Sequence, residues 1–314
     1  MTTASRVALC FPLAAMLGFA PSVRGQHKPL GRQFAERAEE HYQLALGIKA
    51  ESHSVAIETV AAQTYVTPLA HSAEVVLRWR AKRQVLAVQP DGTAEIEEAL
   101  TPTGPQCVAT PQAPEETELA LQTSLNEFCN RFMKSAALHY FESRRGLLRQ
   151  ETPAAVPPLG ESTPPLLALW LLRAVRPSVI FPALTFEVGA KSQRSSQPAV
   201  AALQNARGSE TTEWLDAPGE VPAATLHVVQ QLSWNSSPPP QTPPSPIGAS
   251  SPQPIETFFA DSLTTLSLLD GSVLHASRTA SRTTSLPVNA VPGLPQPPDF
   301  SSKVTLSITI ERLP

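Results

Sequence analysis

The sequence predicts an α+β fold, in which one large, curved, mostly antiparallel β-sheet, shaped like a half-barrel, is covered by two helices. Alternating apolar and polar residues, typical of strands with one buried face, fill much of the first and last thirds of the chain. Two stretches of helical character lie between them, at about 114–137 and 165–175. Because strand sequence flanks the helices on both sides, we expect both halves to join one sheet.

Four alternating stretches carry most of the strand signal. They are HYQLALGIKAE (41–51), AEVVLRWRAKRQVLAVQPDGTAEIEEAL (73–100), IETFFADSLTTLSLLDGSVLHASRTASRTTSL (255–286) and KVTLSITIERL (303–313). The second is interrupted at Pro90-Asp91-Gly92 and the third at Asp270-Gly271. These residue types favour tight turns, because proline presets its φ, aspartate caps the turn and glycine accepts positive φ. Both stretches therefore predict β-hairpins.

The two helices are predicted from different patterns. In 114–137, Pro114 suits a first turn, Glu115 and Glu116 suit the positive end of a helix, and apolar residues follow at spacings of three and four. The stretch 165–175 is apolar on nearly every side and ends before Pro177, which cannot continue a helix. It is too short to span a bilayer and is expected to cover an apolar groove or lie in the core.

The N-terminus predicts export. Residues 1–25 combine Arg6, an apolar run and small residues before Gln26, which is typical of a secretory signal peptide. We expect cleavage near Gln26 and a secreted or periplasmic protein with no transmembrane segment. Residues 26–40 are then an N-terminal lead, and residues 41–314 form a single β-rich domain.

Proline accounts for 33 of the 314 residues, and much of it is concentrated in loops. These proline-rich loops are expected at 152–165, 236–254 and 287–300. The stretch 236–254 contains no charged residue and lies between two strand-like segments. Neither flank is long enough for its own core, so an exposed excursion of polyproline character is favoured over an interdomain linker or a polyproline ligand.

Two cysteines remain after removal of the signal peptide. Cys107 precedes the first predicted helix and Cys129 lies within it. In an oxidising compartment this pair predicts a disulfide that joins loop to helix, and two buried free thiols are the alternative. Asn235 begins an Asn-Ser-Ser glycosylation motif, which is used only if the source is eukaryotic.

The sequence offers little catalytic chemistry. The formal net charge is -3, which favours no nucleic-acid partner. The seven histidines are dispersed along the chain, and no phosphate loop, zinc helix or serine-hydrolase motif is present, so no metal or cofactor is predicted. Glu95, Glu97 and Glu98 offer a carboxylate pair for acid–base chemistry, but basic residues on the preceding strand make cross-strand salt bridges the favoured interpretation.

Large apolar residues provide the best candidates for a ligand site. An apolar cavity between sheet and helix would be lined by Trp79, Leu169, Trp170, Trp214 and Trp234. Core packing is the alternative role for each of these side chains.

The layout of HYQLALGIKAE, AEVVLRWRAKRQVLAVQPDGTAEIEEAL and KVTLSITIERL, after a signal peptide and around two helices, resembles the half-barrels of periplasmic lipoprotein-carrier proteins. It also resembles various secreted bacterial proteins of unknown function. The resemblance covers about half of the mature chain, contains no diagnostic motif, and has no counterpart for the proline-rich insertions. It implies a curved sheet and a lipid-type cargo, and no functional residue is transferred.

Three functions follow from these observations. The first is a secreted or periplasmic non-enzymatic protein that binds an apolar or acyl ligand in a groove between sheet and helix. The second is a structural or envelope protein-interaction module, which acts through the exposed sheet surface and the proline-rich loops. The third is a hydrolase whose site is assembled from residues distant in sequence.

Overall fold

The computed structural model describes most of the chain outside the N-terminus and several loops. The described residues are 28–60, 63–103, 108–109, 136–150, 170, 174–181, 185–196, 206–217, 219, 221–235, 254–286 and 300–314. Residues 1–27, both predicted disulfide cysteines, Leu169 and almost all of the three proline-rich loops lie outside this set. The predictions made for them therefore stay predictions.

Fourteen strands make up the described elements. They are β1 (Lys28–Pro29), β2 (Glu39–Val60), β3 (Gln63–Val88), β4 (Ala94–Pro102), β5 (Val108–Ala109), β6 (Ala136–Glu142), β7 (Leu148–Gln150), β8 (Thr185–Phe186), β9 (Lys191–Ser196), β10 (Arg207–Ala217), β11 (Ala223–Asn235), β12 (Ile255–Ser267), β13 (Val273–Leu286) and β14 (Phe300–Arg312).

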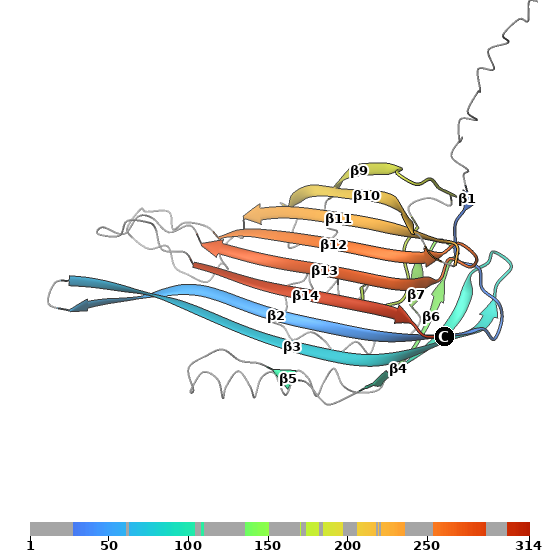
Figure 1. The fold of residues 1–314 in the computed structure, drawn as a ribbon, viewed down its shortest axis with the longest axis horizontal. Helices are drawn as coiled ribbons and strands as arrows, with labels where there is room; N and C mark the ends of the chain where they lie inside the picture. The colour runs from blue at the N-terminus through green and yellow to red at the C-terminus, as the bar shows by residue number, and fades with distance from the viewer. Residues whose placement is uncertain are drawn as a thin grey trace, which may run out of the picture.

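Twelve of these strands form one antiparallel sheet, which confirms the prediction of a large antiparallel sheet. Its order is β7-β6-β4-β3-β2-β14-β13-β12-β11-β10-β9, with β5 also paired to β3 (Figure 1). The C-terminal strand β14 lies between β2 and β13 and joins the two halves of the sheet, with Ile308 opposite Leu46. Strands β1 and β8 form a separate two-stranded sheet.

Both predicted hairpin turns are confirmed. Gly92, between β3 and β4, has a φ of 82°, and Gly271, between β12 and β13, has a φ of 69°. The Asp91 carboxylate accepts a hydrogen bond from the Thr93 backbone N–H at 2.8 Å. The Asp270 carboxylate does the same for Ser272 at 3.0 Å. These turns need glycine because other residues rarely adopt a positive φ.

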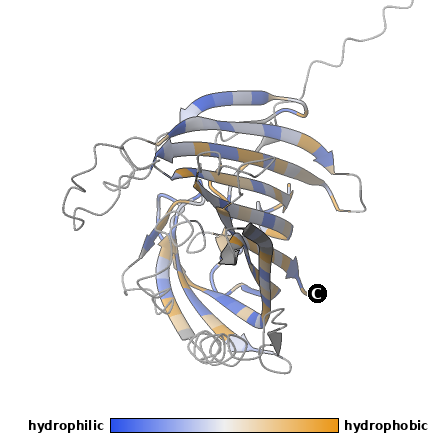
Figure 2. Cartoon of the chain, turned by 90° about the vertical axis from the view of Figure 1, so that its left-hand side faces the viewer, coloured by the Kyte–Doolittle hydropathy of each residue, from blue (hydrophilic) through white to orange (hydrophobic). Residues whose placement is uncertain are grey.

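Alternation along the strands buries one face of the sheet. Leu44 and Leu46 on β2, Leu77 on β3, and Ile308 and Ile310 on β14 belong to one hydrophobic core. The residues between them face outward, because successive side chains of a strand point to opposite faces. The sheet is bent and strongly twisted (Figure 2), so its buried face is an inner face.

The prediction of an α+β fold with two covering helices is wrong. Among the described residues only Trp170 and Ala174 have helical backbone, and most of the others belong to strands. At the end of the first predicted helix, Ala136 and Ala137 belong to β6 and pair with β4, while 114–135 lie outside the described residues. Of the second predicted helix, Trp170 and Ala174 are helical and Val175 lies in a turn, while 165–169 and 171–173 lie outside the described residues. A short apolar run has the same composition whether it becomes a helix or another buried segment, so composition could not decide.

The inner face is covered instead by residues 174–181, here called the strap, and by the turn between β6 and β7. The strap reaches this turn through the Phe181 backbone N–H, which donates to the Arg145 carbonyl at 3.0 Å. Within the described part of the chain, no helix has the length and apolar character needed to cross a membrane.

Candidate ligand-binding site

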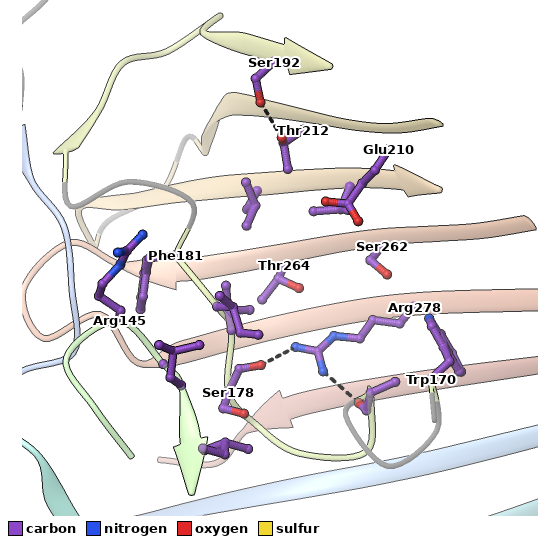
Figure 3. A pocket seen from close by; sticks show the side chains of 18 of the residues that line it. Arg145, Trp170, Ser178, Phe181, Ser192, Glu210, Thr212, Ser262, Thr264 and Arg278 are labelled. Atoms are coloured by element: carbon purple, nitrogen blue, oxygen red, sulfur yellow. Dashed lines mark hydrogen bonds between the residues drawn. The ribbon is translucent and has the colours of Figure 1, made fainter. Parts of the chain in front are cut away.

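A cavity of about 710 Å³ lies between the strap and the inner face of strands β9 to β13 (Figure 3). The turn between β6 and β7 closes part of it, through residues 145–148. Its apolar lining includes Trp170, Val179, Phe181, Leu226 and Val228. Its polar lining includes Ser192, Thr212, Ser262, Thr264, Arg145, Arg194, Glu210 and Arg278. The cavity therefore offers both an apolar and a polar surface.

Strand register brings five of these side chains into one row across the sheet. Ser192 on β9 lies opposite Thr212 on β10, and Thr212 lies opposite Val228 on β11. Val228 lies opposite Ser262 on β12, which in turn lies opposite Arg278 on β13. Because directly opposite residues share a face, the row runs from a polar edge, across one apolar residue, to a buried guanidinium.

The polar edge of the cavity is held by side-chain contacts between β9 and β10. The Ser192 and Thr212 hydroxyls are 2.7 Å apart, and Figure 3 shows the hydrogen bond between them. Arg194 and Glu210 form an ion pair at 2.5 Å, although 75% of the Arg194 side chain is exposed. This edge is thus the solvated side of the cavity.

Arg278 forms the buried polar wall. It is 5% exposed and donates hydrogen bonds to three carbonyl oxygens of the strap, those of Ala174 (2.8 Å), Arg176 (3.0 Å) and Ser178 (3.0 Å). Burial lowers the pKa of its guanidinium to about 10, so the group is still a cation at neutral pH. Among the described residues it has no carboxylate partner within salt-bridge distance.

A second buried arginine lies further along the inner face and has a very different environment. Arg83 on β3 contacts Glu40 at 2.8 Å, Glu98 at 3.6 Å and Glu142 through a short ion pair. It also donates to the hydroxyl of Tyr140 at 3.0 Å. We call the following residues the ionic cluster: Arg83, Glu40, Glu98, Glu142 and Tyr140, together with Arg32 and Arg176.

The charges of the ionic cluster balance. Arg32, Arg83 and Arg176 supply three positive charges, and Glu40, Glu98 and Glu142 supply three negative ones. Arg32 pairs with Glu40 at 2.9 Å, and the guanidinium of Arg176 lies 4.8 Å from the centre of the Tyr140 ring. Arg83 also donates to the Pro177 carbonyl at 3.2 Å, so the cluster fixes the middle of the strap.

Electrostatics within the ionic cluster favour the charged forms of Glu40 and Arg83. Burial alone would raise the pKa of the Glu40 carboxyl, but the Arg32 and Arg83 guanidinium groups outweigh it and lower the pKa below its usual value. Burial would lower the pKa of Arg83, but Tyr140, Glu142 and Glu40 together hold it well above its usual value. The Glu40 carboxyl and the Arg83 guanidinium are therefore ionised at neutral pH.

The structure gathers the four tryptophans into one apolar region but gives them different positions. Trp79, Trp214 and Trp234 are buried in the main hydrophobic core, and Trp170 packs against that core. Trp170 also lines the cavity, whereas the other three are not among its lining residues. Leu169 lies outside the described residues.

Sequence reasoning missed Arg278 and the ionic cluster. The signal for Arg278 was its position, since it lies between Ala276 and Ala280 in the inward-facing phase of β13. Of the three candidate carboxylates, Glu98 is buried beside Arg83, Glu95 lies 2.7 Å from His139, and Glu97 lies opposite Gln84 and His139 on neighbouring strands. No group of three or more metal-ligating side chains that could hold a metal ion was found among the described residues.

Comparison with known proteins adds no family. No protein-family model matches the chain, and no curated protein matches it. Among solved structures, the InvG secretin domain β-barrel from the Salmonella SPI-1 injectisome NC-base has a TM-score of 0.16 and 10% identity, covering 88% of this chain and 63% of that one. A near-atomic cryo-EM structure of the same secretin has a TM-score of 0.15 and 9% identity, covering 89% and 65%.

This chain therefore spans less than two thirds of the secretin chains that it matches. At such TM-scores the likeness does not establish a common fold. The resemblance to lipoprotein carriers stays a prediction.

Proposed function

We propose that the protein is a secreted or periplasmic, non-enzymatic binding protein that holds an amphipathic, acyl-type ligand in the cavity beneath the strap. The observation that carries the proposal is the cavity itself. Its volume of about 710 Å³ falls within the range of about 300–1,000 Å³ that is common for small-molecule sites. Its lining joins an apolar surface to a few polar groups, as such sites usually do.

The apolar part of the ligand would lie over Val228, Leu226, Phe181 and Trp170. These residues come from β11, the strap and the segment that precedes it, so the ligand would be covered on two sides. Burial of apolar surface contributes roughly 25 cal/mol per Å², which makes an acyl chain a suitable ligand for this surface.

The test is direct binding to the protein purified after export. Native mass spectrometry would detect a co-purified lipid, and a neutral hydrophobic dye such as Nile red would report the apolar cavity. Val228→Trp should fill the cavity and reduce dye binding. Val229→Trp is the matched control, because Val229 is the next residue of β11 and faces away from the cavity. Absence of both lipid and dye binding in the unmodified protein would refute the proposal.

Export can be tested separately. N-terminal sequencing of the protein recovered outside the cytoplasm should begin at Gln26. A protein retained inside the cell with its first 25 residues intact would contradict this assignment.

A specific feature of the sheet favours a second function, that of an envelope protein-interaction module. The pairing of β14 with β2 ends at Ser301 and His53, but β2 and β3 remain paired to Val60 and Gln63. This hairpin projects beyond its neighbours in Figure 1. It exposes Tyr65 (53%) and Leu69 (38%). An apolar surface on such a projection suits contact with another protein.

Cross-linking in living cells would test the second function. The unmodified protein should give a defined cross-linked product, and the double variant Tyr65→Ser, Leu69→Ser should lose it. Deletion of 236–254 tests the contribution of the proline-rich loop in the same assay. Full retention of the product in both variants would count against an interaction role for these segments.

A further inference from the structure

We propose that the cavity selects a ligand with an anionic head group, a carboxylate, and that Arg278 is the residue that recognises it. This inference rests on the proposed function and names its ligand class, a long-chain carboxylic acid. It is carried by the placement of Arg278, by its hydrogen bonds and by the charges that surround it.

The first step is the position of Arg278. Its side chain lies on the inner face of β13, is 5% exposed and lines the cavity. Figure 3 shows the guanidinium between the strap and the Ser262 and Thr264 side chains of β12. Ser262 lies directly opposite Arg278. Ser262 and Thr264 both line the cavity. A head group here would meet one cation and two hydroxyl groups.

The second step is the hydrogen-bond capacity of Arg278. A guanidinium has five N–H donors arranged in a planar fork. Three hydrogen bonds to strap carbonyls occupy three of them: Nη1 donates to Ala174 and Arg176, and Nη2 donates to Ser178. The N–H of Nε and the second N–H of Nη2 make none of these three hydrogen bonds. Nε and Nη2 together form the edge of the guanidinium that can bind a carboxylate in bidentate fashion.

The third step is charge. Carbonyl oxygens satisfy hydrogen bonds but do not neutralise a cation, and a buried cation without a counter-charge is costly. Among the described residues no carboxylate pairs with Arg278. Glu210, the one carboxylate in the described lining of the cavity, pairs with Arg194. A carboxylate on the ligand would supply the missing negative charge.

Arg282 provides an internal comparison. It lies four residues further along β13, with its side chain on the same face as Arg278, and it pairs with Glu256 at 2.5 Å. Arg282 is not among the residues that line the cavity. Within the described part of the chain, β13 thus carries one arginine that pairs with a protein carboxylate outside the cavity and one arginine in the cavity wall that does not.

The proposed orientation follows from the row of residues across the sheet. The carboxylate lies at Arg278, Ser262 and Thr264, and the chain extends over Val228 and Leu226 towards the solvated edge at β9 and β10. The buried charge is then paired and the apolar chain covers apolar residues, which satisfies both requirements at once.

The experiment compares head groups on one chain length with the unmodified protein. Hexadecanoate, hexadecanol and hexadecylamine are each titrated against bound Nile red, and the dissociation constant of each is obtained from the displacement of the dye. We expect the acid to bind about tenfold to a hundredfold more tightly than the alcohol, as a charge-assisted pair of hydrogen bonds would provide, and the amine to bind most weakly. Equal binding of acid and alcohol would overturn the head-group inference and leave the proposed function standing. Binding of none of the three would overturn both.

Variants assign the effect to Arg278. Arg278→Met should remove the preference for acid over alcohol, Arg278→Lys should keep part of it, and Arg282→Met should keep all of it. Circular dichroism and denaturant unfolding establish that each variant is folded. Should Arg278→Met not fold, the comparison of head groups with the unmodified protein still decides the matter. A folded Arg278→Met protein that keeps the full preference would assign recognition to another residue and overturn the proposal.

Discussion

Two buried arginines on the same inner face are surrounded in opposite ways. Arg83 contacts three carboxylates in a cluster whose charges balance, whereas Arg278 is held by three main-chain carbonyls. A charge-balanced and largely buried cluster joins elements of the fold and has no charge left for a ligand. A buried cation without a protein carboxylate retains that charge. We therefore assign a structural role to the ionic cluster and a binding role to Arg278.

The largest effect is expected from Arg83→Met. This change leaves Glu98 and Glu142, both buried, without their main counter-charge. Breaking a buried pair in this way typically costs about 3–5 kcal/mol of stability, which denaturant unfolding would measure. The control is Arg80→Met, because Arg80 is exposed on the outer face of the same strand and should change stability by no more than about 0.5 kcal/mol. Similar losses in both variants would contradict a special role for the cluster.

Arg278→Met is expected to cost less, about 1–3 kcal/mol. Three strap carbonyls lose their donor, but no carboxylate is left uncompensated, and removal of a buried cation offsets part of the loss. The same unfolding experiment gives the value. A loss of stability as large as that of Arg83→Met would show that Arg278 contributes to the fold as much as Arg83 does. It would contradict the difference in role between the two arginines.

Acid should weaken the ionic cluster through Glu40. Its pKa is lowered in the folded protein, although burial opposes this shift, because Arg32 and Arg83 stabilise the carboxylate. A lowered folded-state pKa gives stability that is present above the unfolded-state pKa of about 4.3 and is lost as pH falls through the folded-state pKa. The stability difference between the unmodified protein and Glu40→Gln should therefore shrink below about pH 4.3 in unfolding curves. A difference that stays constant with pH would argue against this coupling.

The smallest effect is expected at the exposed ion pair between Arg194 and Glu210. Because 75% of the Arg194 side chain is exposed, Arg194→Gln should change stability by less than about 1 kcal/mol, and added salt should reduce the difference further. Thermal unfolding at low and high salt checks this. A larger and salt-independent loss would place Arg194 with the buried arginines.

The antiparallel sheet could be predicted because its signals are local. The Pro90–Gly92 and Asp270–Gly271 turns and the alternation on either side of them lie within a few residues of one another. The same kind of local signal could not decide whether the two predicted helices form. Ala136 extends the helical spacing of 121–132, yet it pairs with Leu100 on β4, a partner 36 residues away. Strand pairing with a distant segment overrides local propensity where the two disagree.

Part of the candidate site could have been predicted. The inward phase of β13 assigns Arg278 to the buried face, and the inward phase of β3 assigns Arg83 to the same face. Their partners could not be predicted, since the strap carbonyls lie 100 to 104 residues from Arg278 and Glu142 lies 59 residues from Arg83. The face on which a side chain lies follows from its position along the strand, which is a local property. The group that it meets there depends on how the sheet bends.

The sequence by itself determined the strands that flank the two hairpin turns, the position of those turns and which side chains of these strands share a face, because the pleat of a strand alternates its side chains. Only the tertiary structure decided that the strap covers the inner face of the bent sheet. It also decided that Arg83 meets three carboxylates, whereas Arg278 meets none among the described residues. The physical reason is that a buried charge is defined by its neighbours in space, and these neighbours are distant in the chain.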